Sequence, residues 1–451
     1  MHTTVFEFGY LSSDQVAASE LKATLISGDA FNYLKEVSLS AAEAETRKCL
    51  NLSKRYGYEL IQVKNYVGVL FTPTGEYIEV LPKVGRKGLD RKQAEESSRE
   101  TLLMMLQHLG VFRHLVTNQA SITTKKMPLL EVFISQFLAS VNLLVKRGLK
   151  SDYIREVDNQ NFLKGKLLVA KQLRHNFVNQ HKFYVEFDDY QINRPANRLI
   201  KTAMVKLSKY TRLAVNQKLL RELEFTFAEV PLSKSVKQDI NDLKLDRGMK
   251  DYHVPIDWAK LILEGFSPLS MQGDHNTLSL LFPMESVFES YVASILGEQL
   301  SKGAVLTTQT RSEYLVTHNE EDQFQLKPDL LISLPNERKV VLDTKWKLLD
   351  ERSSNGGLSQ SDFYQMFAYG HKYLKGKGDM VLIYPACETF KEPIENCFEF
   401  DKEQMLRLWV VPMDLDPDKQ NRDRLKLPEG FSLLDRFVRS EINSVDKNIY
   451  Q

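Results

Sequence analysis

Cysteine is nearly missing from this chain: 451 residues include three, at Cys49, Cys387 and Cys397. Three scattered thiols cannot form a disulfide framework, and none belongs to a Cys-x-x-Cys pair of the kind that holds structural zinc. This usage indicates a reducing compartment, so we expect a cytoplasmic protein. No apolar run approaches the length of a membrane span, and the start, MHTTVFEFGY, lacks a basic and apolar signal segment. We therefore expect no membrane partner.

Net charge is also close to absent, at +1, with 60 basic and 59 acidic residues. Overall charge therefore gives no indication of a nucleic-acid partner. The local distribution says more, because residues 143–182 contain nine Lys/Arg and three Asp/Glu, with Tyr153, Phe162 and Phe177 among them. Such a stretch can follow a phosphate backbone, or it can be an ordinary solvated helix face.

Length and composition indicate several globular domains. A chain of 451 residues is too long for one ordinary core, and 43% apolar with 26% charged residues is typical of a folded globular protein. We predict a mixed α/β fold in three parts. These are a β-rich N-terminal domain over 1–125, a mostly helical middle region over 126–275 that contacts DNA or a partner, and an α/β domain over 276–451.

Hydrophobic periodicity places the main elements. Residues 58–84 contain two β-rich runs around Thr-Pro-Thr-Gly, a hairpin signal with Pro73 and Gly75 in the turn. A charged loop over 85–100 and a linker over 268–277 separate the regular segments. Apolar spacing predicts helices over 99–109, 129–146, 197–220 and 256–263, and short β pieces over 167–171 and 183–187. After Pro283 the order helix, strand, strand, helix, strand indicates an α/β domain.

Two acids and a lysine fall at the ends of two predicted strands. A Pro-Asp pair ending at Asp329 precedes the apolar run LLISL, and a short turn leads to Lys-Val-Val-Leu-Asp-Thr-Lys, which contains Asp343 and Lys345. Strand side chains alternate, so Asp343 and Lys345 point to one face, and Val340 and Leu342 point into the core if the strand is half buried. An antiparallel pair would bring Asp329 beside Asp343.

This trio meets the minimal needs of metal-assisted phosphodiester hydrolysis. A divalent ion polarises the phosphate and lowers the pKa of the attacking water, and magnesium usually takes one or two carboxylates besides waters and substrate oxygens. Asp329 and Asp343 are therefore candidate ligands. Glu285 and Glu289 lie four residues apart in the predicted helix PMESVFESYVASIL, and either can supply a third acid. Glu289, flanked by aromatic residues, is the better candidate.

A helical pair follows the strands. Gln365 and Tyr369 lie four residues apart and so share one face of a predicted helix. Pro-Asp followed by Asp-x-Lys is a weak pattern alone, and the helical residues on either side make it more specific. The chain thereby resembles the PD-(D/E)xK nucleases that carry a Q-x-x-x-Y helix motif, through Glu289, Asp329, Asp343, Lys345, Gln365 and Tyr369.

The rest of the chain narrows the resemblance to the McrC family, the nuclease subunits of McrBC modification-dependent (type IV) restriction systems. It covers roughly residues 58 to 412 and depends on motifs in order: Glu-Val-Leu-Pro-Lys at 79–83, Leu-Lys-Gly-Lys at 163–166, Asn-Arg-Pro-Ala-Asn-Arg at 193–198 and Pro-Met at 283–284. One departure from the family pattern is Lys166, where the family usually has arginine. Lysine keeps the positive charge but cannot make the bidentate hydrogen bonds of arginine. Residues 1–55 and 413–451 match nothing that we can name.

The resemblance implies a restriction-endonuclease-like domain that hydrolyses DNA, with assigned roles for the six residues. The acids Glu289, Asp329 and Asp343 would bind Mg²⁺, or Mn²⁺ in its place. Lys345 would orient or activate the water and stabilise developing negative charge. The helical pair, Gln365 and Tyr369, would position the lysine, a ligand or the scissile phosphate.

The resemblance also implies partners. McrC proteins cut double-stranded DNA together with McrB, an AAA+ ring that hydrolyses GTP and recognises the modified base. This sequence has no G-x-x-x-x-G-K-[ST] loop, so GTP should bind the partner. The N-terminal domain would dock the ring, and a double-strand cut favours a nuclease-domain dimer within the assembly. Two alternatives stay open: a restriction nuclease for an unmodified site, and a non-catalytic adaptor that stimulates an AAA+ GTPase.

Overall fold

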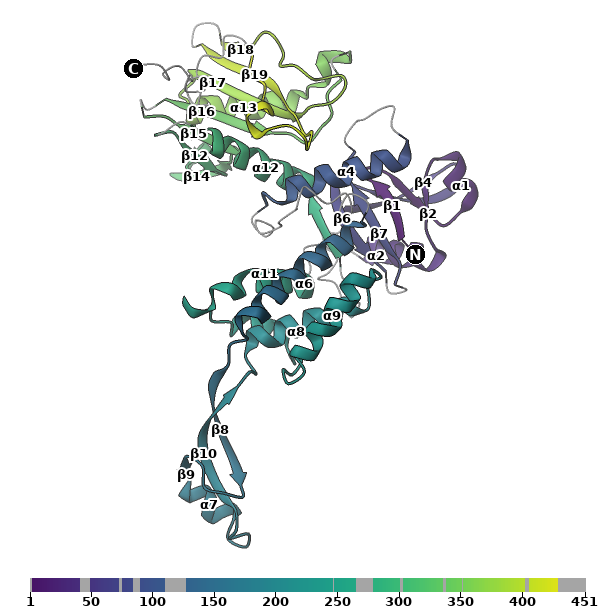
Figure 1. Cartoon of the computed structure of the whole chain (residues 1–451). Helices are drawn as coiled ribbons and strands as arrows, with labels where there is room; N and C mark the ends of the chain where they lie inside the picture. Colours follow the sequence, from purple (N-terminus) through teal and green to yellow (C-terminus); the bar gives the residue numbers. More distant parts are fainter. Residues whose placement is uncertain are drawn as a thin grey trace, which may run out of the picture. The chain divides into compact units, whose positions relative to one another are not determined.

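The computed structural model describes residues 2–40, 49–72, 75–83, 90–109, 127–245, 247–264, 279–300, 303–335, 338–350, 352–401 and 405–428. These residues form a mixed α/β structure, as predicted (Figure 1). The chain divides into two compact units, each made of separate stretches of sequence. Unit 1 comprises Met1–His2, Val69–Glu79 and Met127–Leu280, and unit 2 comprises Thr3–Gly68, Val80–Lys126 and Leu281–Gln451. The division into domains at residues 125 and 275 stays a prediction.

The N-terminal part is rich in strands, as predicted. One sheet has the order β3-β2-β5-β4 and another the order β1-β7-β6-β11. The elements are β1 (His2–Phe6), β2 (Tyr10–Ser12), α1 (Gln15–Glu20), β3 (Thr24–Leu25), α2 (Gly28–Ser40), β4 (Leu50–Arg55), β5 (Tyr58–Val63), β6 (Tyr66–Phe71), β7 (Tyr77–Leu81) and β11 (Ser279–Pro283).

The predicted hairpin is present between β6 and β7, which are neighbours in their sheet. The Thr72 N–H donates to the Glu76 carbonyl (2.9 Å), and Gly75 takes a φ of 77°, which glycine adopts without strain. Pro73 lies outside the described residues. The first predicted β run consists of two strands, β5 and β6, because the chain turns at residues 64–65.

Helix α4 (Arg91–Leu106) begins inside the stretch that we predicted as a loop, so the expected start at Arg99 is wrong. A capping box explains the early start. The Asp90 carboxylate accepts the Gln93 N–H (2.7 Å), and the Gln93 side chain accepts the Asp90 N–H (3.4 Å). The first turns carry few apolar residues, so apolar spacing detects only the later, buried half.

Helix α6 (Leu129–Arg147) closely matches its prediction and ends before Gly148, which has a φ of 92°. Its length and mean hydropathy of 1.5 suit a membrane span, which corrects our expectation that no apolar run has such a length. In this structure 56% of the apolar window is buried. The helix contacts α9 and α11 (His253–Glu264), the latter a predicted helix, so α6 has the packing of a core helix.

The single helix predicted over 197–220 is wrong, because two helices occupy this region. They are α8 (Pro195–Ser208) and α9 (Ala214–Thr226), with a break at residues 209–213. Apolar spacing continues through the break, so the sequence pattern does not reveal it. The remaining helices of this region are α10 (Val236–Asn241) and the 3-10 helix η2 (Arg247–Tyr252).

A buried carboxylate on α6, that of Glu131, holds the break in place. It accepts hydrogen bonds from the Thr211 hydroxyl (2.8 Å), the Leu213 N–H (3.1 Å) and the Asn216 amide (2.8 Å). The bond from Leu213 satisfies a backbone donor that a continuous helix would have used, and the other two fix the side chains on either side of it. The break between α8 and α9 therefore depends on Glu131, which precedes Thr211 by 80 residues in the sequence.

An arm emerges between α6 and α8 (Figure 1). Its strands β8 (Asp152–Gln160) and β10 (Phe183–Gln191) pair antiparallel along their whole length. Strand β10 contains the β piece that we predicted over 183–187, whereas β8 was not predicted. The basic stretch lies largely on this arm, where Phe162 and Phe177 are exposed.

The β piece predicted over 167–171 is wrong after its first residue. Strand β9 (Lys166–Leu167) is followed by the short helix α7 (Val169–His175), none of whose residues is buried. The basic residues of the stretch are therefore spread over the end of α6, the strands β8 and β9, the helix α7 and the segments between them, and not along one helix face.

A six-stranded sheet forms the centre of the C-terminal part, in the order β12-β15-β16-β17-β19-β18. The predicted antiparallel pair is present as β15 (Leu330–Ser333) and β16 (Lys339–Thr344). Strand β17 (Gly378–Pro385) runs parallel to β16, and β19 (Leu406–Met413) runs parallel to β17. Helices α12 (Met284–Gln299) and α13 (Gln360–Tyr373) both contact β16.

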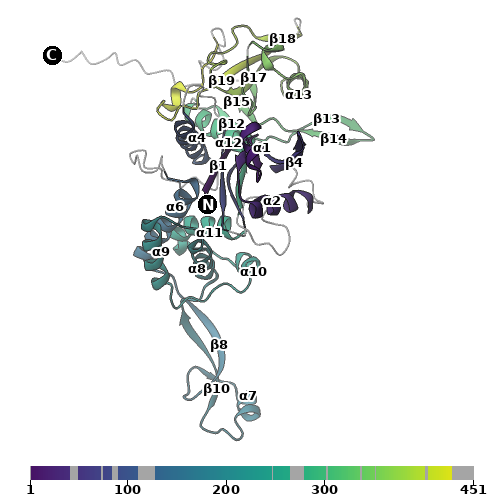
Figure 2. The same cartoon turned by 90° about the vertical axis from the view of Figure 1, so that its right-hand side faces the viewer.

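The structure adds strands that the sequence pattern did not indicate. Figure 2 shows the hairpin of β13 and β14 reaching out from the sheet. The added elements are β12 (Val305–Thr308), β13 (Glu313–His318), β14 (Glu321–Leu326), β18 (Phe398–Asp401) and the 3-10 helices η4 (Ser354–Gly357) and η5 (Asn421–Asp423).

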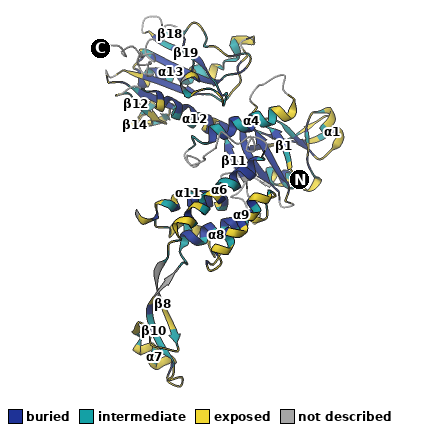
Figure 3. Ribbon diagram, viewed as in Figure 1, coloured by how far each residue is buried: buried dark blue, intermediate teal, exposed yellow. Residues whose placement is uncertain are grey.

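Strand β16 is buried on both faces, not on one as we expected. Val340, Val341 and Leu342 have no exposed surface, and Asp343 is 1% exposed. Figure 3 shows the inner strands of this sheet, β15, β16, β17 and β19, largely as buried ribbon. An acid in such a strand loses most of its hydration, so it needs compensation from its neighbours.

Candidate active site

Six side chains singled out from the sequence come from adjoining elements of unit 2. Asp329 directly precedes β15, Asp343 lies near the end of β16, and Lys345 follows that strand. Because Leu330 pairs with Leu342 in the antiparallel ladder, both aspartates lie at one edge of the sheet. The other three are Glu289 on α12 and Gln365 and Tyr369 on α13.

Asp329 is fixed by the strand beside it. Its Oδ2 accepts hydrogen bonds from both the N–H (2.8 Å) and the hydroxyl (2.6 Å) of Thr344. Thr344 stands between Asp343 and Lys345, so the carboxylate of Asp329 is held at their level. The contact uses one oxygen of Asp329 and leaves the other for a ligand.

Asp343 is a buried acid with too few partners. Among the described residues the Lys345 ammonium group forms an ion pair with its carboxylate, and no backbone N–H or hydroxyl donates to either oxygen. Burial raises the pKa of Asp343 well above its ordinary value, and the nearby Asp329 carboxylate raises it further. This edge of the sheet has an excess of negative charge that a cation would relieve.

Lys345 is held by a chain of hydrogen bonds. The sequence pattern placed its members, Gln365 and Tyr369, in the same site but did not show how they are bonded to Lys345. Its ammonium group donates to Gln365 Oε1 (3.0 Å), and Gln365 Nε2 donates to the Tyr369 hydroxyl (2.7 Å). That hydroxyl donates to the Lys327 carbonyl (2.9 Å), two residues before Asp329. Burial opposes the charge of Lys345, but Asp343 outweighs it, and the pKa of Lys345 is raised.

Glu289, not Glu285, belongs to this edge of the sheet. Burial raises the pKa of Glu289 to about 7, and the charge of Asp329 adds to the shift, which places the two carboxylates in one electrostatic environment. Glu285 instead accepts a hydrogen bond from the Asn65 amide (3.0 Å). Of the two candidates, Glu289 is thus the one that shares the electrostatic environment of Asp329, and its role as the third acid stays a prediction.

Gln309 joins the site and was missed in the sequence. Its side-chain amide donates to both oxygens of Glu289 (3.1 and 3.3 Å), and its N–H donates to the Asp329 carbonyl (2.8 Å). It adopts a φ of 46°, an uncommon conformation for a residue with a side chain, which no local motif signals. Gln309 and Glu289 also line a hollow of about 580 Å³ together with His108.

The donor set fits a magnesium site of the two-carboxylate kind. Asp329 and Asp343 offer hard oxygen ligands, and Asp343 lacks the hydrogen bonds that a permanently buried carboxylate normally has. Among the described residues, no three His, Cys, Asp or Glu side chains gather closely enough to hold a metal ion. Glu289 as a third ligand therefore stays a prediction.

Comparisons with known proteins identify the family of this chain. A family model described as McrBC 5-methylcytosine restriction system component matches residues 61–385. The chain belongs to this family. The family predicted from the ordered motifs is thereby confirmed, and the protein is a component of a restriction system. No match is found among curated proteins.

Two solved structures contain chains that are similar to this McrBC family member. The chain is similar to one in the refined half-complex from a tetradecameric assembly of Thermococcus gammatolerans McrB AAA+ hexamers with bound McrC. The TM-score is 0.66 at 19% identity, covering 93% of this chain and 96% of that one. A chain in the cryo-EM structure of the Thermococcus gammatolerans McrBC complex gives a TM-score of 0.47 at 20% identity, covering 67% and 89%. The first likeness shows a shared fold over nearly the whole chain.

Trp346 ties the site of this McrBC family member to the start of the chain. Its ring meets Phe288, the neighbour of Glu289, edge-on at 5.3 Å between centroids. Its indole N–H donates to both carboxylate oxygens of Glu7 (2.9 and 3.0 Å), which also accept the Lys83 N–H (2.8 Å). Glu7 and Trp346 are 339 residues apart, so no sequence pattern could have paired them.

Replacing Glu7 by glutamine should change how stability depends on pH. Burial raises the pKa of Glu7 to about 7 from 4.5, so its contribution is fully present below pH 4.5 and is lost as pH rises through about 7. Glu7→Gln removes this loss, because the amide oxygen keeps the accepted hydrogen bonds without a charge. Relative to the unaltered protein, the variant should gain up to about 3 kcal/mol of unfolding free energy between pH 5 and pH 8.

Urea unfolding of both proteins at the two pH values measures this gain. The matched control is Glu20→Gln, which alters an exposed glutamate of the same unit. If the unfolding free energy changed equally with pH in the Glu7 variant and in the unaltered protein, the result would contradict the conclusion that burial disfavours the charged form of Glu7.

Proposed function

We propose that this chain is the endonuclease subunit of its restriction system and cleaves modified, methylated double-stranded DNA by metal-assisted phosphodiester hydrolysis. The observation that carries the proposal is the buried Asp343 carboxylate, which lies beside Asp329 and is compensated by one ion pair, with Lys345. A purely structural acid at this place would cost stability with no return. The edge formed by β15, β16 and α13 then has the makeup of a PD-(D/E)xK nuclease centre.

Asp329 and Asp343 would hold Mg²⁺, or Mn²⁺ in its place. The bound ion would polarise the phosphate and lower the pKa of the attacking water. Thr344 keeps Asp329 in position through two hydrogen bonds, so the two carboxylates approach one another without needing to move. Such preorganisation matters because the repulsion between the acids is overcome during folding, before substrate arrives.

Lys345 would stabilise the negative charge that develops on the phosphate. Gln365 accepts one of its ammonium hydrogens and so directs the remaining ones, while Tyr369 keeps Gln365 oriented. Glu289, with a pKa of about 7, can hold or release a proton at neutral pH on the same side of the sheet. Together these groups supply charge stabilisation and proton exchange around one reacting phosphate.

The proposed setting is a complex with an McrB-like AAA+ GTPase ring in the cytoplasm. The similar solved chain comes from an assembly whose description names McrB AAA+ hexamers with bound McrC. GTP would bind the partner, since the sequence has no phosphate-binding loop of the Walker type. Cutting both DNA strands requires two centres, which a pair of nuclease domains within the assembly would provide.

Asp343→Ala and Lys345→Ala should each lower the DNA cleavage rate by at least about a thousandfold, because each removes charge from the reacting phosphate's surroundings. Cleavage is measured with the GTPase partner and GTP present, on methylated and unmethylated copies of one DNA. Assembly and GTP turnover should stay unchanged. The matched control is Glu285→Ala. Glu285 lies on α12, the helix that also carries Glu289, but its carboxylate accepts a hydrogen bond from Asn65.

Cleavage retained by both variants would refute the nuclease assignment. Equal digestion of methylated and unmethylated DNA by the unaltered complex would favour the alternative target, an unmodified site. A complex that stimulates GTP turnover and never cuts DNA would favour the adaptor.

Tyr369→Phe should slow cleavage by about ten- to a hundredfold, the usual effect of losing a residue that orients a catalytic group. The variant keeps the ring but loses the hydroxyl that links Gln365 to the Lys327 carbonyl. The control is Tyr373→Phe one turn later, whose hydroxyl donates to the carbonyls of Thr310 and Leu326 away from Lys345.

Single-turnover rates at saturating DNA separate the two tyrosines. The proposed relay predicts a lower cleavage rate with unchanged DNA affinity for Tyr369→Phe. A similar loss of rate in both variants would assign Tyr369 an ordinary structural role.

A further inference from the structure

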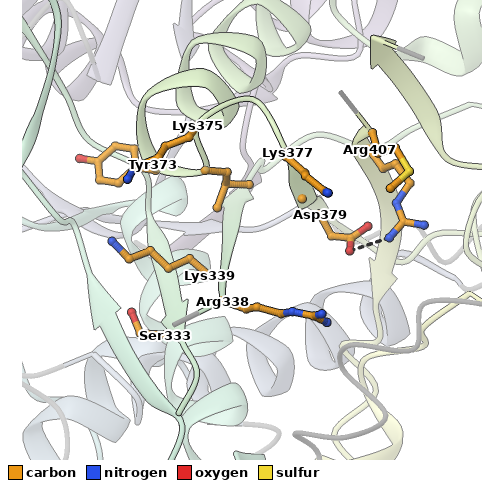
Figure 4. Close-up of a pocket in the computed structure, with 11 residues that line it drawn as sticks. Ser333, Arg338, Lys339, Tyr373, Lys375, Lys377, Asp379 and Arg407 are labelled. Carbon is orange, nitrogen blue, oxygen red and sulfur yellow. Dashed lines mark hydrogen bonds and ion pairs between the residues drawn. The ribbon is translucent and has the colours of Figure 1, made fainter. Parts of the chain in front are cut away.

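A second hollow lies at the end of β16 away from the candidate active site. It has a volume of about 750 Å³ and is lined by the starts of β16, β17 and β19 and by the loop after α13 (Figure 4). Lys339 opens β16 and Asp343 lies near its end, so about 13 Å of strand separates the hollow from the acids. The lining residues are Ser333, Arg338, Lys339, Tyr373, Leu374, Lys375, Lys377, Gly378, Asp379, Met405 and Arg407.

This hollow, which we call the cationic pocket, carries a strong excess of positive charge. Five lining residues are cationic and one is acidic. The acid, Asp379, is 1% exposed, and its carboxylate accepts hydrogen bonds from Arg407 (2.9 Å) and Trp409 (2.9 Å). The negative charge of Asp379 is therefore paired with Arg407 in the wall of the pocket, as the dashed line in Figure 4 marks. The remaining lining cations are Arg338, Lys339, Lys375 and Lys377.

The backbone after α13 places two of these lysines at the rim. Lys375, Gly376 and Gly378 all have positive φ, at 56°, 78° and 142°. For Lys375 this conformation costs on the order of 1 kcal/mol, which the loop's hydrogen bonds must offset. The bonds run from the Gly376 N–H to Gly370 (3.1 Å) and from the Gly378 N–H to Met405 (3.3 Å). The loop is thus held in a conformation that gathers positive charge.

One wall group also has an unused donor. Arg407 Nε is buried and has no hydrogen-bond partner among the described residues, although the guanidinium pairs with Asp379 through Nη2. Guanidinium and ammonium groups around a polar hollow match phosphate oxygens in both charge and geometry.

We propose that the cationic pocket binds phosphates of the DNA backbone at a distance from the cleaved bond. The inference rests on the proposed function, because it takes DNA as the substrate. The excess of cations favours a polyanion over an apolar or neutral ligand. A separation of about 13 Å from the acids equals roughly four base-pair steps measured along the axis of a duplex, at about 3.4 Å of axis each. The pocket would thus hold DNA next to the segment at the active site.

The experiment measures duplex affinity as a function of salt for the full-length chain carrying Asp343→Ala, which prevents cleavage. Each phosphate contact contributes about −0.9 to the slope of log affinity against log salt. Adding Lys375→Gln and Lys377→Gln should make that slope about 2 less steep and weaken binding at low salt about tenfold or more. The control pair is Lys372→Gln and Lys391→Gln, exposed lysines of unit 2 outside the pocket lining.

Outcomes separate the possible ligands. An unchanged slope in the pocket variant, or equal changes in both pairs, would overturn the proposal. Competition by inorganic phosphate or a nucleoside triphosphate in the unaltered pocket, without any effect of the lysine changes on DNA affinity, would assign the pocket to small anions and also overturn it. Cleavage by otherwise unaltered protein is scored separately, so failure of the nuclease assignment remains distinguishable from failure of the pocket.

Discussion

Asp343 lies in a strand covered on both faces, so its charge is almost cut off from water. Asp329 adds a second negative charge at the same edge, and the Lys345 ammonium group supplies one positive charge in return. Two acids, one of them buried, with one cation are short of positive charge, and our proposal of a metal site rests on this shortage. Other contacts of the site can be understood as fixing these three groups.

Two sets of contacts do this fixing from different directions. On one side, Gln365 and Tyr369 tie Lys345 to the chain segment that carries Asp329. On the other, Trp346 bridges α12 and the N-terminal segment through Phe288 and Glu7. Within unit 2, therefore, residues from the first and last parts of the chain converge on one strand end. Glu7 in the N-terminal segment is thereby bonded to the indole ring of the residue that directly follows Lys345.

Local patterns were sufficient to find the strands and helices that carry the predicted site. Alternation identified β15 and β16, and i to i+4 spacing placed Gln365 and Tyr369 on α13, because these features depend on neighbours in sequence. The same reasoning could not see Gln309 or Glu7, whose roles depend on distant partners. It also missed the break between α8 and α9, which the carboxylate of Glu131 holds from another helix.

The central claim is that Asp329 and Asp343 form a divalent-metal site, and calorimetric titration of the full-length chain with Mn²⁺ tests it most directly. The account predicts saturable binding that Asp343→Asn weakens by at least about tenfold, with protons released on binding at pH 7 because the buried Asp343, whose pKa is raised, must ionise. A matched change at an exposed acid of the same unit, Asp322→Asn, should leave binding unchanged. Identical titrations of the unaltered protein and Asp343→Asn would contradict the account.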